Sequence, residues 1–528
     1  MKYNILTFLT AVTLLTSCSK EFLDRPDTNA PTLETFYNTS EQVEGATGLL
    51  YGAAWYPFMD RAFLSIGEIM GGTGITSGPG DYAPYMNFTV SETDAQIYRA
   101  WNSFYKVAGV STILINEFEK KKGTLGDQAF LNKGIAEARF MRAMAYFYLT
   151  RVFQHVPIIT DPIQLATSGD TKVPRYKQSD VLKFIIDDLK VAEAGLPTVI
   201  SEPRLRVNAY SAKALMAKVY LYMKDYENAK AKASEVINSG KFDLFPDYYT
   251  MFSTAQSNGN IESLFAFQWT ATGDYSSANH TQTNIGPGPL LSPKPAGAGG
   301  YSSVVPSINL LNSFESGDLR RKSVMEHGFF RQDWKNDNYP NGYTYDTTAA
   351  AGAGKQILTA TRTNSAKYIV GTGTNGEKVN GSNTEVCTYI IRYADVLLIY
   401  AEAVLGDNSS TTDASALAAF NKVRHRAGFS ASLDKTVLTK DIILHERMIE
   451  FNFEGDFWFD VQRQGFDKAK QILHAQERGE YTTNNGVRTI NHMDVSGQFV
   501  SENQLFLPIP SAEKVSNPLL TQEPVNFY

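Results

Sequence analysis

The stretch YSAKALMAKVYLYMKDYENAKAKASEVINSGKF, Tyr210–Phe242, decides the fold because it holds two helical patterns joined at a polar turn, Lys224-Asp225. Large and aromatic residues recur at helical spacing before the turn, and alanines recur at helical spacing after it. Small side chains let two helices approach closely, while large ones fill the groove between neighbouring pairs. The spacing is typical of the helix-turn-helix repeat of roughly 34 residues.

Two other parts of the chain carry a similar arrangement: Tyr393, Leu397 and Tyr400 followed by Ala416, Phe420 and Val423, and, more divergently, Trp101 and Phe104 followed by Ala136, Phe140 and Ala143. One such match is weak evidence, because helical hairpins show this spacing by chance. Three dispersed matches predict a scaffold of helical repeats. Long helices are expected over 101–121 and 134–157, and Ser179 is expected to cap a third.

A different character separates the helical blocks. Glycine and proline dominate 286–300, which excludes regular structure there. From Trp269 to Tyr345 the chain is loop-like and rich in aromatic residues. The segment that ends in LPIPSAEKVSNPLLTQEP is punctuated by prolines and is expected to be extended. The fold class is therefore mainly α, with helix pairs packed against an irregular, loop-rich half that contains little β-structure.

The amino terminus has the features of a lipoprotein leader. Lys2 provides a positive start, and the apolar run Ile5–Leu15 is far shorter than the ~20 residues needed to span a bilayer. Leu15-Thr16-Ser17 followed by Cys18 resembles a bacterial lipobox, which implies that Cys18 becomes the acylated first residue. The alternative is an ordinary secretory signal with a coincidental cysteine. Two or three acyl chains would hold the protein firmly at a membrane.

Composition excludes several classes of protein. Hydrophobic residues make up 43% of the chain and charged residues 20%, as in an ordinary globular protein. The formal net charge is −6, and cleavage would remove Lys2, so nucleic acid is not an expected partner. Cys387 is the only other cysteine, so lipidation of Cys18 would leave no internal disulfide.

Many segments, in order, resemble the SusD/RagB family, the outer-membrane nutrient-binding lipoproteins of Bacteroidetes. They are CSKEFLD, WNSFYKVAG, EARFMRAMAYFYLTRVFQHVP, ALMAKVYLYMKDYENAKAKASEVINSGKFDL, RYADVLLIYAEA, FNKVRHRAGF, ERMIEFNFEGDFWFDVQR and LPIPSAEKVSNPLLTQ, and together they cover nearly all of 18–522. Each segment alone is a modest pattern, whereas the ordered set is specific.

The resemblance implies about four tetratricopeptide-like helix pairs and an irregular half that carries the ligand site. The implied boundaries are a signal peptide at 1–17, a lipidated tether at 18–40, an N-terminal half at 41–240 and a C-terminal half at 241–528. Within the C-terminal half, 269–380 would hold ligand loops, 388–470 a helical repeat and the remainder an extended tail. The implied partner is a SusC-like TonB-dependent transporter in the outer membrane.

The residues themselves indicate a sugar site. A sugar ring has an apolar face, which flat Tyr and Trp rings cover, and a rim of hydroxyls, which polar side chains bind. Two loop-like regions combine both types. The candidate ligand residues are Asp81, Tyr85, Asn87 and Arg99 in the first, and Trp269, Tyr275, Tyr301, Trp334, Tyr339 and Tyr343 in the second. The alternative for each aromatic is that it only packs its loop onto the body.

Catalysis is not indicated. Glu446, Glu450 and Glu454 recur every four residues, but this spacing predicts a charged helix stripe rather than a hydrolytic carboxylate pair. No metal-ligand cluster, phosphate loop or nucleophile elbow is present, so neither a metal nor a cofactor is expected. We therefore expect a glycan-capturing surface lipoprotein that is not an enzyme. The alternatives are a peptide-capturing, RagB-like lipoprotein and a protein-binding tetratricopeptide adaptor.

Overall fold

The computed structural model describes residues 36–76, 80–126, 128–271, 274–286, 300–326, 328–332, 334, 340–345, 363–370, 378–380, 383–484 and 487–528. Seven helices dominate it, and each packs against the next in chain order. They are α5 (Ala95–Leu125), α6 (Ala129–Phe153), α8 (Gln178–Gly195), α9 (Ala209–Tyr222), α10 (Tyr226–Asn238), α14 (Tyr393–Leu405) and α15 (Ala414–Arg426). The prediction of a mainly helical fold built from helix pairs is confirmed.

The helix pair that begins at Ala209 owes its geometry to small residues and caps. Ala229 and Ala233 on α10 are fully buried, which brings its backbone close to α9. Asn208 and Ser211 form a reciprocal capping box at the start of α9, and the Asp225 carboxylate accepts from the Asn228 N–H at the start of α10. The turn at Lys224-Asp225 therefore lies where the sequence predicts it.

Shorter helical elements connect and flank this stack. They are α3 (Ser40–Gly48), η1 (Ala53–Trp55), η2 (Phe58–Ala62), η3 (Ser65–Ile69), α4 (Ala83–Met86), α7 (Pro162–Ser168), α11 (Thr250–Ser253), η4 (Ala255–Ser257), η5 (Tyr275–Ser277), α12 (Thr281–Ile285), α13 (Ile308–Ser313), η7 (Leu319–Ser323), η8 (Ala431–Leu433), α16 (Lys440–Glu450), α17 (Phe457–Gln462), α18 (Phe466–His474), η9 (Glu502–Leu505), α19 (Ser511–Ser516) and η10 (Pro518–Thr521). Of these, η2 and η3 are π-helices.

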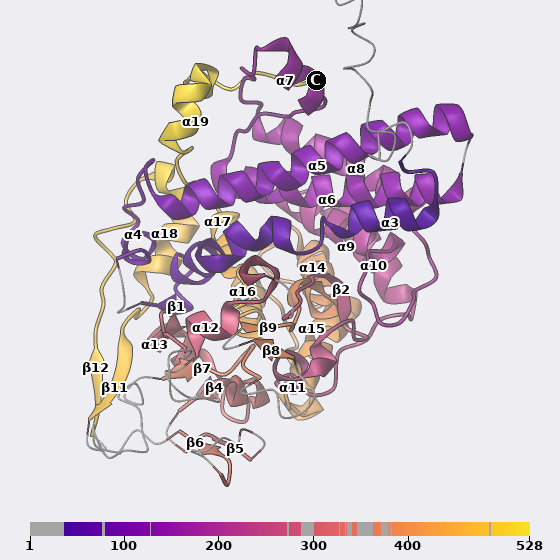
Figure 1. The fold of residues 1–528 in the computed structure, drawn as a ribbon. Coiled ribbons are helices and arrows are strands. Elements are labelled where there is room, and N and C mark those ends of the chain that lie inside the picture. The colour runs from indigo at the N-terminus through magenta and orange to yellow at the C-terminus, as the bar shows by residue number, and fades with distance from the viewer. Residues whose placement is uncertain are drawn as a thin grey trace, which may run out of the picture.

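Strands are few and pair only in twos among the described residues. The pairs are β1 (Gly74–Ile75) with β3 (Val305–Pro306), β2 (Ser263–Phe267) with β10 (Thr388–Arg392), β4 (Val324–Met325) with β7 (Asn364–Ser365), β5 (Phe330–Arg331) with β6 (Tyr343–Thr344), β8 (Val379–Asn380) with β9 (Asn383–Thr384) and β11 (Glu480–Asn484) with β12 (Val487–Asn491), all antiparallel. In Figure 1 the long helices α5 and α6 cross the upper part of the molecule, and most short strands lie below them.

Several boundaries differ from the sequence-based expectation. The helices expected over 101–121 and 134–157 run over Ala95–Leu125 and Ala129–Phe153. Helix α8 begins at Gln178, so Ser179 lies inside its first turn and Lys177 is the cap residue. The tail is not simply extended, because it contains α19 and η10. Pro518 stands at the first position of η10, where a missing N–H costs nothing, so this proline starts a helix instead of interrupting one.

The expected lipid anchor, Cys18, lies outside the described residues, as does most of the expected tether 18–40. The first described residues already belong to the body: Tyr37 packs edge-on against Phe118 at 5.1 Å between ring centroids, and Thr39 caps α3. Within the described ranges, no helix combines the length and apolar character that crossing a membrane requires.

A buried ion-pair cluster, consisting of Glu262, Arg320, Arg392, Arg426, Glu446 and Glu450, joins the loop-rich half to the helices. The side chain of every member is at most 4% exposed. Arg320 Nη1 lies 2.6 Å from Glu446 Oε1 and 3.1 Å from Glu450 Oε2. The glutamates of α16 are thus committed to internal ion pairs, which leaves them unsuited to hydrolysis.

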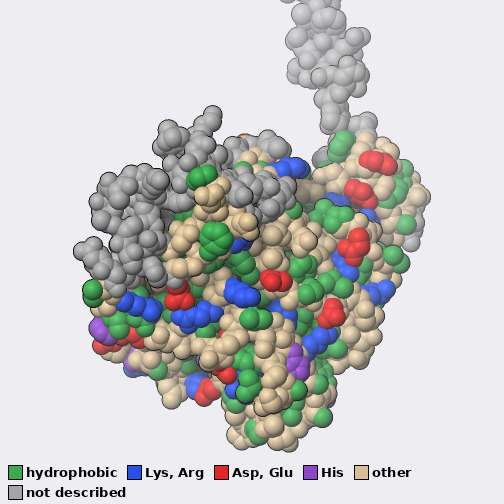
Figure 2. Space-filling view, turned by 90° about the horizontal axis from the view of Figure 1, so that it is seen from below, with side chains coloured by type: hydrophobic (Ala, Val, Ile, Leu, Met, Phe, Trp, Pro, Cys, Tyr) green, Lys and Arg blue, Asp and Glu red, His purple; other side chains and the backbone are tan. Residues whose placement is uncertain are grey.

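The outer surface carries charges of both signs. Figure 2 views the molecule from below relative to Figure 1 and shows basic and acidic side chains interspersed over that face. Such a mixture creates no extended field of one sign and does not favour a long polyanion.

Candidate functional site

The two loop-like regions proposed as ligand-binding meet in space. The Asn284 side-chain amide of α12 donates to the Asp60 carbonyl of η2 at 2.6 Å, and the Ser303 N–H donates to the Asn284 carbonyl at 2.8 Å. Residues 80–82 lie beside this contact, since Arg61 pairs with Asp81. Segments around positions 60, 81, 284 and 303 therefore form one surface. In Figure 1 it lies between α4 and α12.

We call the exposed part of this surface the candidate ligand face; it consists of Asp60, Arg61, Asp81, Arg99 and Tyr301. Two ion pairs lie on it. Arg99 Nη1 is 2.6 Å from Asp60 Oδ2, and Arg61 pairs with Asp81. The side chains of Arg61, Asp81 and Arg99 are 38%, 51% and 46% exposed. Solvated ion pairs of this kind contribute only about 0–1 kcal/mol, so a ligand can share or displace them at little cost.

Tyr301 provides the flat ring of the candidate ligand face. It is 69% exposed, and its N–H donates to the Thr283 carbonyl at 2.8 Å. Its backbone position depends on Gly300: a Cβ there would lie 2.1 Å from the Gly286 carbonyl oxygen, so only glycine permits this approach. Ser302 follows with a positive φ of 46° and donates to the Gly286 carbonyl.

Buried aromatic groups support this surface from beneath. Tyr82 is almost fully buried, and burial raises the pKa of its hydroxyl even though the nearby Arg61 acts in the opposite direction. Tyr56 packs edge-on against His280 at 5.1 Å, which fixes the start of α12. The π-helix η2, which carries Asp60 and Arg61, is of a type found frequently at functional sites.

The arrangement offers a rigid ring beside carboxylates and guanidinium groups that keep contact with water. It can stack on the apolar face of a ring and exchange hydrogen bonds with hydroxyl groups. Across the described ranges, no three His, Cys, Asp or Glu side chains are grouped so that they could hold a metal ion.

The structure brings three of the predicted ligand residues together on this face: Asp81, Arg99 and Tyr301. Asn87 lies nearby in sequence at the end of α4 and is partly exposed. The side chain of Tyr275 and the whole of Tyr339 lie outside the described residues.

The four other predicted residues are buried: Tyr85, Trp269, Trp334 and Tyr343, with exposures of 0%, 8%, 2% and 4%. Tyr85 donates to Asp94 Oδ1 at 2.8 Å, and Trp269 Nε1 donates to Thr388 Oγ1 at 3.0 Å on β10. The Trp334 ring lies 5.9 Å from the Tyr343 ring. These rings pack their segments onto the body, as the alternative interpretation holds, and direct ligand contact by them stays a prediction.

Sequence reasoning missed Asp60, Arg61 and Asn284. A signal for the first two exists, because Asp60-Arg61 interrupts the apolar run PFMDRAFLSI. Adjacent opposite charges within a stretch that is otherwise buried must reach either water or partners. Asn284 gave no such signal, since its role arises only when α12 packs beside η2.

Comparison with known proteins places the whole chain among related sequences. The family model described as "SusD family" matches residues 261–526, and the model described as "Starch-binding associating with outer membrane" matches residues 80–221. A SusD-like protein of Bacteroides ovatus is 31% identical over 100% of this chain and 98% of its own length. SusD-like protein P2 of Formosa agariphila is 26% identical over 98% of both chains.

Solved structures agree with these matches. One crystal structure, determined with a xylogluco-oligosaccharide, has 30% sequence identity and a TM-score of 0.79, covering 92% of this chain and 99% of its own. A SusD homolog from Bacteroides thetaiotaomicron has a TM-score of 0.75 at 20% identity, covering 95% and 99% of the two chains, and so shares the fold.

Proposed function

This chain belongs to the SusD family, and from that premise we propose that it captures an oligosaccharide or polysaccharide at the cell surface without altering it chemically. The captured glycan would pass to a SusC-like TonB-dependent transporter in the outer membrane. Cys18, once acylated, would anchor the protein there.

The observation that carries this proposal is the composition of the candidate ligand face. Tyr301 exposes a ring of low conformational entropy, and two weak ion pairs lie on the same surface. A glycan needs both: an apolar contact for the ring and donors and acceptors for the hydroxyls. The related structure determined with a xylogluco-oligosaccharide makes that class of glycan the first ligand to test.

Affinity electrophoresis of the detergent-extracted mature protein in gels that contain xyloglucan or other polysaccharides tests the proposal. Retardation by at least one glycan is expected, and Tyr301→Ala should abolish it. Tyr528→Ala is a matched control, because Tyr528 is also exposed but lies at the carboxyl terminus beside α8. Equal retardation of Tyr301→Ala and the unmodified protein would contradict the proposed role of this ring.

The absence of retardation on every glycan would instead favour the alternatives, capture of peptides or a protein-binding adaptor. Release of reducing sugar during incubation would contradict the proposal of binding without catalysis.

Membrane attachment is tested separately: Cys18→Ala should move the protein from the membrane fraction to the soluble fraction, and incorporation of labelled palmitate should disappear.

A further inference from the structure

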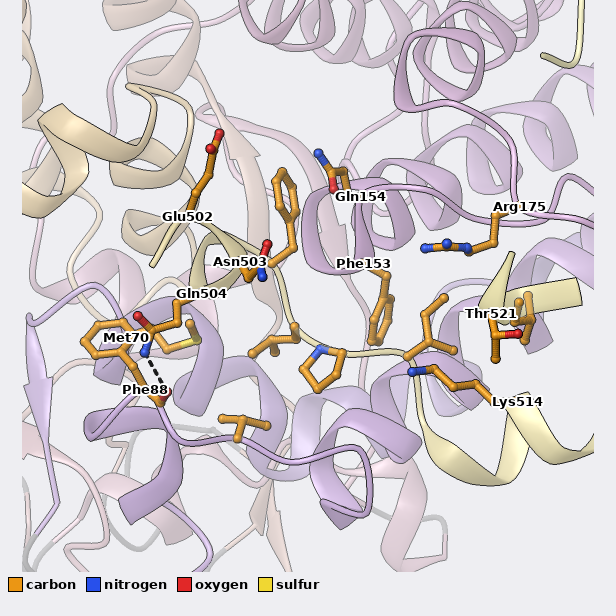
Figure 3. Close-up of a pocket in the computed structure, with 16 residues that line it drawn as sticks. Met70, Phe88, Phe153, Gln154, Arg175, Glu502, Asn503, Gln504, Lys514 and Thr521 are labelled. Carbon is orange, nitrogen blue, oxygen red and sulfur yellow. Dashed lines mark hydrogen bonds between the residues drawn. The ribbon is translucent and has the colours of Figure 1, made fainter. Parts of the chain in front are cut away.

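A cavity of about 610 Å³, the C-terminal cavity, lies where segment 502–521 passes the carboxyl end of α6. Its lining residues come from distant parts of the chain: position 70, positions 88 and 90, positions 153–154, position 175 and the segment 502–521. It shares no residue with the candidate ligand face, and its size lies within the range of small-molecule sites, about 300–1,000 Å³. Figure 3 shows its lining side chains.

One side of the cavity is cationic. Arg175 and Lys514 lie on the same side of Phe153 in Figure 3, across the cavity from Met70 and Phe88. The Nη2 group of Arg175 donates to the Gln522 carbonyl at 2.5 Å, while its Nε atom is buried without a hydrogen-bond partner among the described residues. A buried N–H of a guanidinium without an acceptor is costly, so a ligand oxygen there would satisfy it.

Lys514 adds a second donor group at this side. Its Nζ lies 2.5 Å from Glu92 Oε1, yet the side chain remains 24% exposed, and an ammonium group has three N–H donors. No ion pair between Arg175 and a carboxylate occurs in the described part of the chain, and burial lowers the pKa of its guanidinium although the charge of Glu523 acts in the opposite direction. The charge of Arg175 is thus the less compensated of the two.

The remaining walls combine rings with amides. Phe153 and Phe506 present aromatic rings, while Gln154 and Asn503 carry amide groups at the upper edge in Figure 3. Gln154 follows α6 with a positive φ of 63°, a conformation that residues other than glycine adopt rarely and that is enriched at functional sites. Glu502, the lining carboxylate, lies on the side away from Arg175.

A third cation lies behind the opposite wall. Arg478 is buried beneath Phe88, with its guanidinium 5.2 Å from the ring centroid, and donates to the Met70 carbonyl at 2.6 Å. In the described ranges it forms no ion pair with a carboxylate. Arg175 at one end of the C-terminal cavity and Arg478 behind the other thus carry positive charge with which no carboxylate of the described ranges forms an ion pair, and this favours an anion.

We infer that the C-terminal cavity is a second ligand site, which binds a sugar unit that carries a carboxylate. The rings cover the apolar face of the sugar, the amides bind its hydroxyls, and Arg175 with Lys514 binds the carboxylate. A simple inorganic anion would use only the cationic side, and a neutral sugar could accept from the Arg175 Nε–H but would bring no negative charge to the guanidinium. This site adds to the proposed function and does not depend on the candidate ligand face.

Isothermal titration of the detergent-extracted mature protein with trigalacturonate, and with neutral galactotriose, tests the inference. Trigalacturonate should bind more tightly than the neutral trisaccharide, and its Kd should rise with ionic strength. Arg175→Gln should raise the Kd about tenfold or more, as expected for a lost charge-assisted hydrogen bond. Lys514→Gln should raise it about threefold, because Glu92 already shares that charge.

Two comparisons keep the result interpretable. Arg175→Gln removes the contact with Gln522 and so could loosen the tail, whereas Lys514 holds no part of the fold beyond its exposed ion pair. Lys190→Gln, which alters an exposed lysine 3.9 Å from Asp187, is the matched control and should leave the Kd unchanged. Tyr301→Ala should also leave it unchanged, while abolishing retention of the glycan at the candidate ligand face.

Equal affinity for the charged and neutral trisaccharides, or an unchanged Kd in both Arg175→Gln and Lys514→Gln, would overturn the inference. Displacement of trigalacturonate by phosphate at equal concentration would also overturn it, because the site would then select charge alone. Failure of Tyr301→Ala to affect glycan retention would count only against the proposed function.

Discussion

The buried ion-pair cluster and the candidate ligand face are built from the same kinds of side chain but differ in their access to water. In the cluster, Glu450 is fully buried and contacts three arginines. On the face, Arg99 and Asp60 form a pair that is partly exposed. Buried charges are costly to leave incomplete, whereas exposed pairs are weak and exchangeable. Arginine–carboxylate pairs thus hold the loop-rich half in place in the buried cluster, whereas on the candidate ligand face they remain available to a ligand.

The largest effect should follow from breaking the buried cluster. Glu450→Gln removes a charge that Arg320, Arg392 and Arg426 share, and should lower the free energy of unfolding by about 3–5 kcal/mol. Urea denaturation measures it. Glu119→Gln is the matched control, because Glu119 is exposed and lies 3.8 Å from Lys122. A loss below about 1 kcal/mol for Glu450→Gln would mean that the buried and exposed pairs contribute alike.

The second-largest effect is the difference in free energy of unfolding between substituting the buried ring of Trp269 and substituting the exposed ring of Tyr301. Trp269→Ala should lower the free energy of unfolding by about 3 kcal/mol, because it leaves a cavity beside β10, while Trp269→Phe should cost about 1 kcal/mol for the lost bond to Thr388. Tyr301→Ala should change it by less than about 0.5 kcal/mol. Thermal or urea unfolding of the three variants checks this ranking. A Trp269→Ala variant as stable as the unmodified protein would show that this ring does not hold its segment on the body, and Trp269 would then remain a candidate for ligand contact.

Acid should weaken the cluster in a defined window. Burial opposes ionisation of Glu450, but Arg426, Arg392 and Arg320 outweigh it and hold the pKa of its carboxyl at about 2, below its ordinary value near 4.5. The unfolded chain binds this proton first, so the stabilisation is complete above pH 4.5 and is lost as pH falls toward 2.

The deficit of Glu450→Gln relative to the unmodified protein should therefore shrink by about 2 kcal/mol between pH 7 and pH 3. Urea denaturation of both proteins at pH 7, 5 and 3 measures it. A deficit that stays constant over this range would show that folding leaves the pKa of the Glu450 carboxyl unchanged.

The smallest effect on stability belongs to the exposed pair. Asp60→Asn should lower the free energy of unfolding by less than about 1 kcal/mol, yet raise the glycan Kd about tenfold, because Arg99 loses its orientation and a ligand acceptor is removed. Asp441→Asn, at an exposed pair with Lys468, should change neither quantity. If Asp60→Asn destabilised the fold as strongly as Glu450→Gln, the contrast between the two regions would be wrong.

The helices could be predicted because their signals are local. The turn at Lys224-Asp225, with large residues on one side and alanines on the other, is legible without any knowledge of the remaining chain. Polar and aromatic composition also marked the segments that hold Asp81, Arg99 and Tyr301, although Arg99 lies on α5 and not in a loop, and composition did not indicate that these segments meet.

The rest depended on contacts between distant segments. Trp269 and Trp334 look like ligand-binding rings in sequence, because loops are usually exposed, but both are buried against other elements. The tail looked extended because prolines interrupt it, yet Pro518 begins a helix once Asn517 caps it. The burial of the two tryptophans is not encoded within a few residues, whereas the Asn517-Pro518 helix start is a local signal that the other prolines obscured.

The sequence by itself determined the helix pairs and their family, because periodicity, caps and turns are properties of neighbouring residues. The tertiary structure alone decided which charges became buried and which remained exposed, and it brought Asp60 against Asn284, which lies 224 positions away in the chain. Desolvation is the physical reason: the energy of a charged or aromatic side chain depends on what surrounds it, and only the folded chain defines those surroundings.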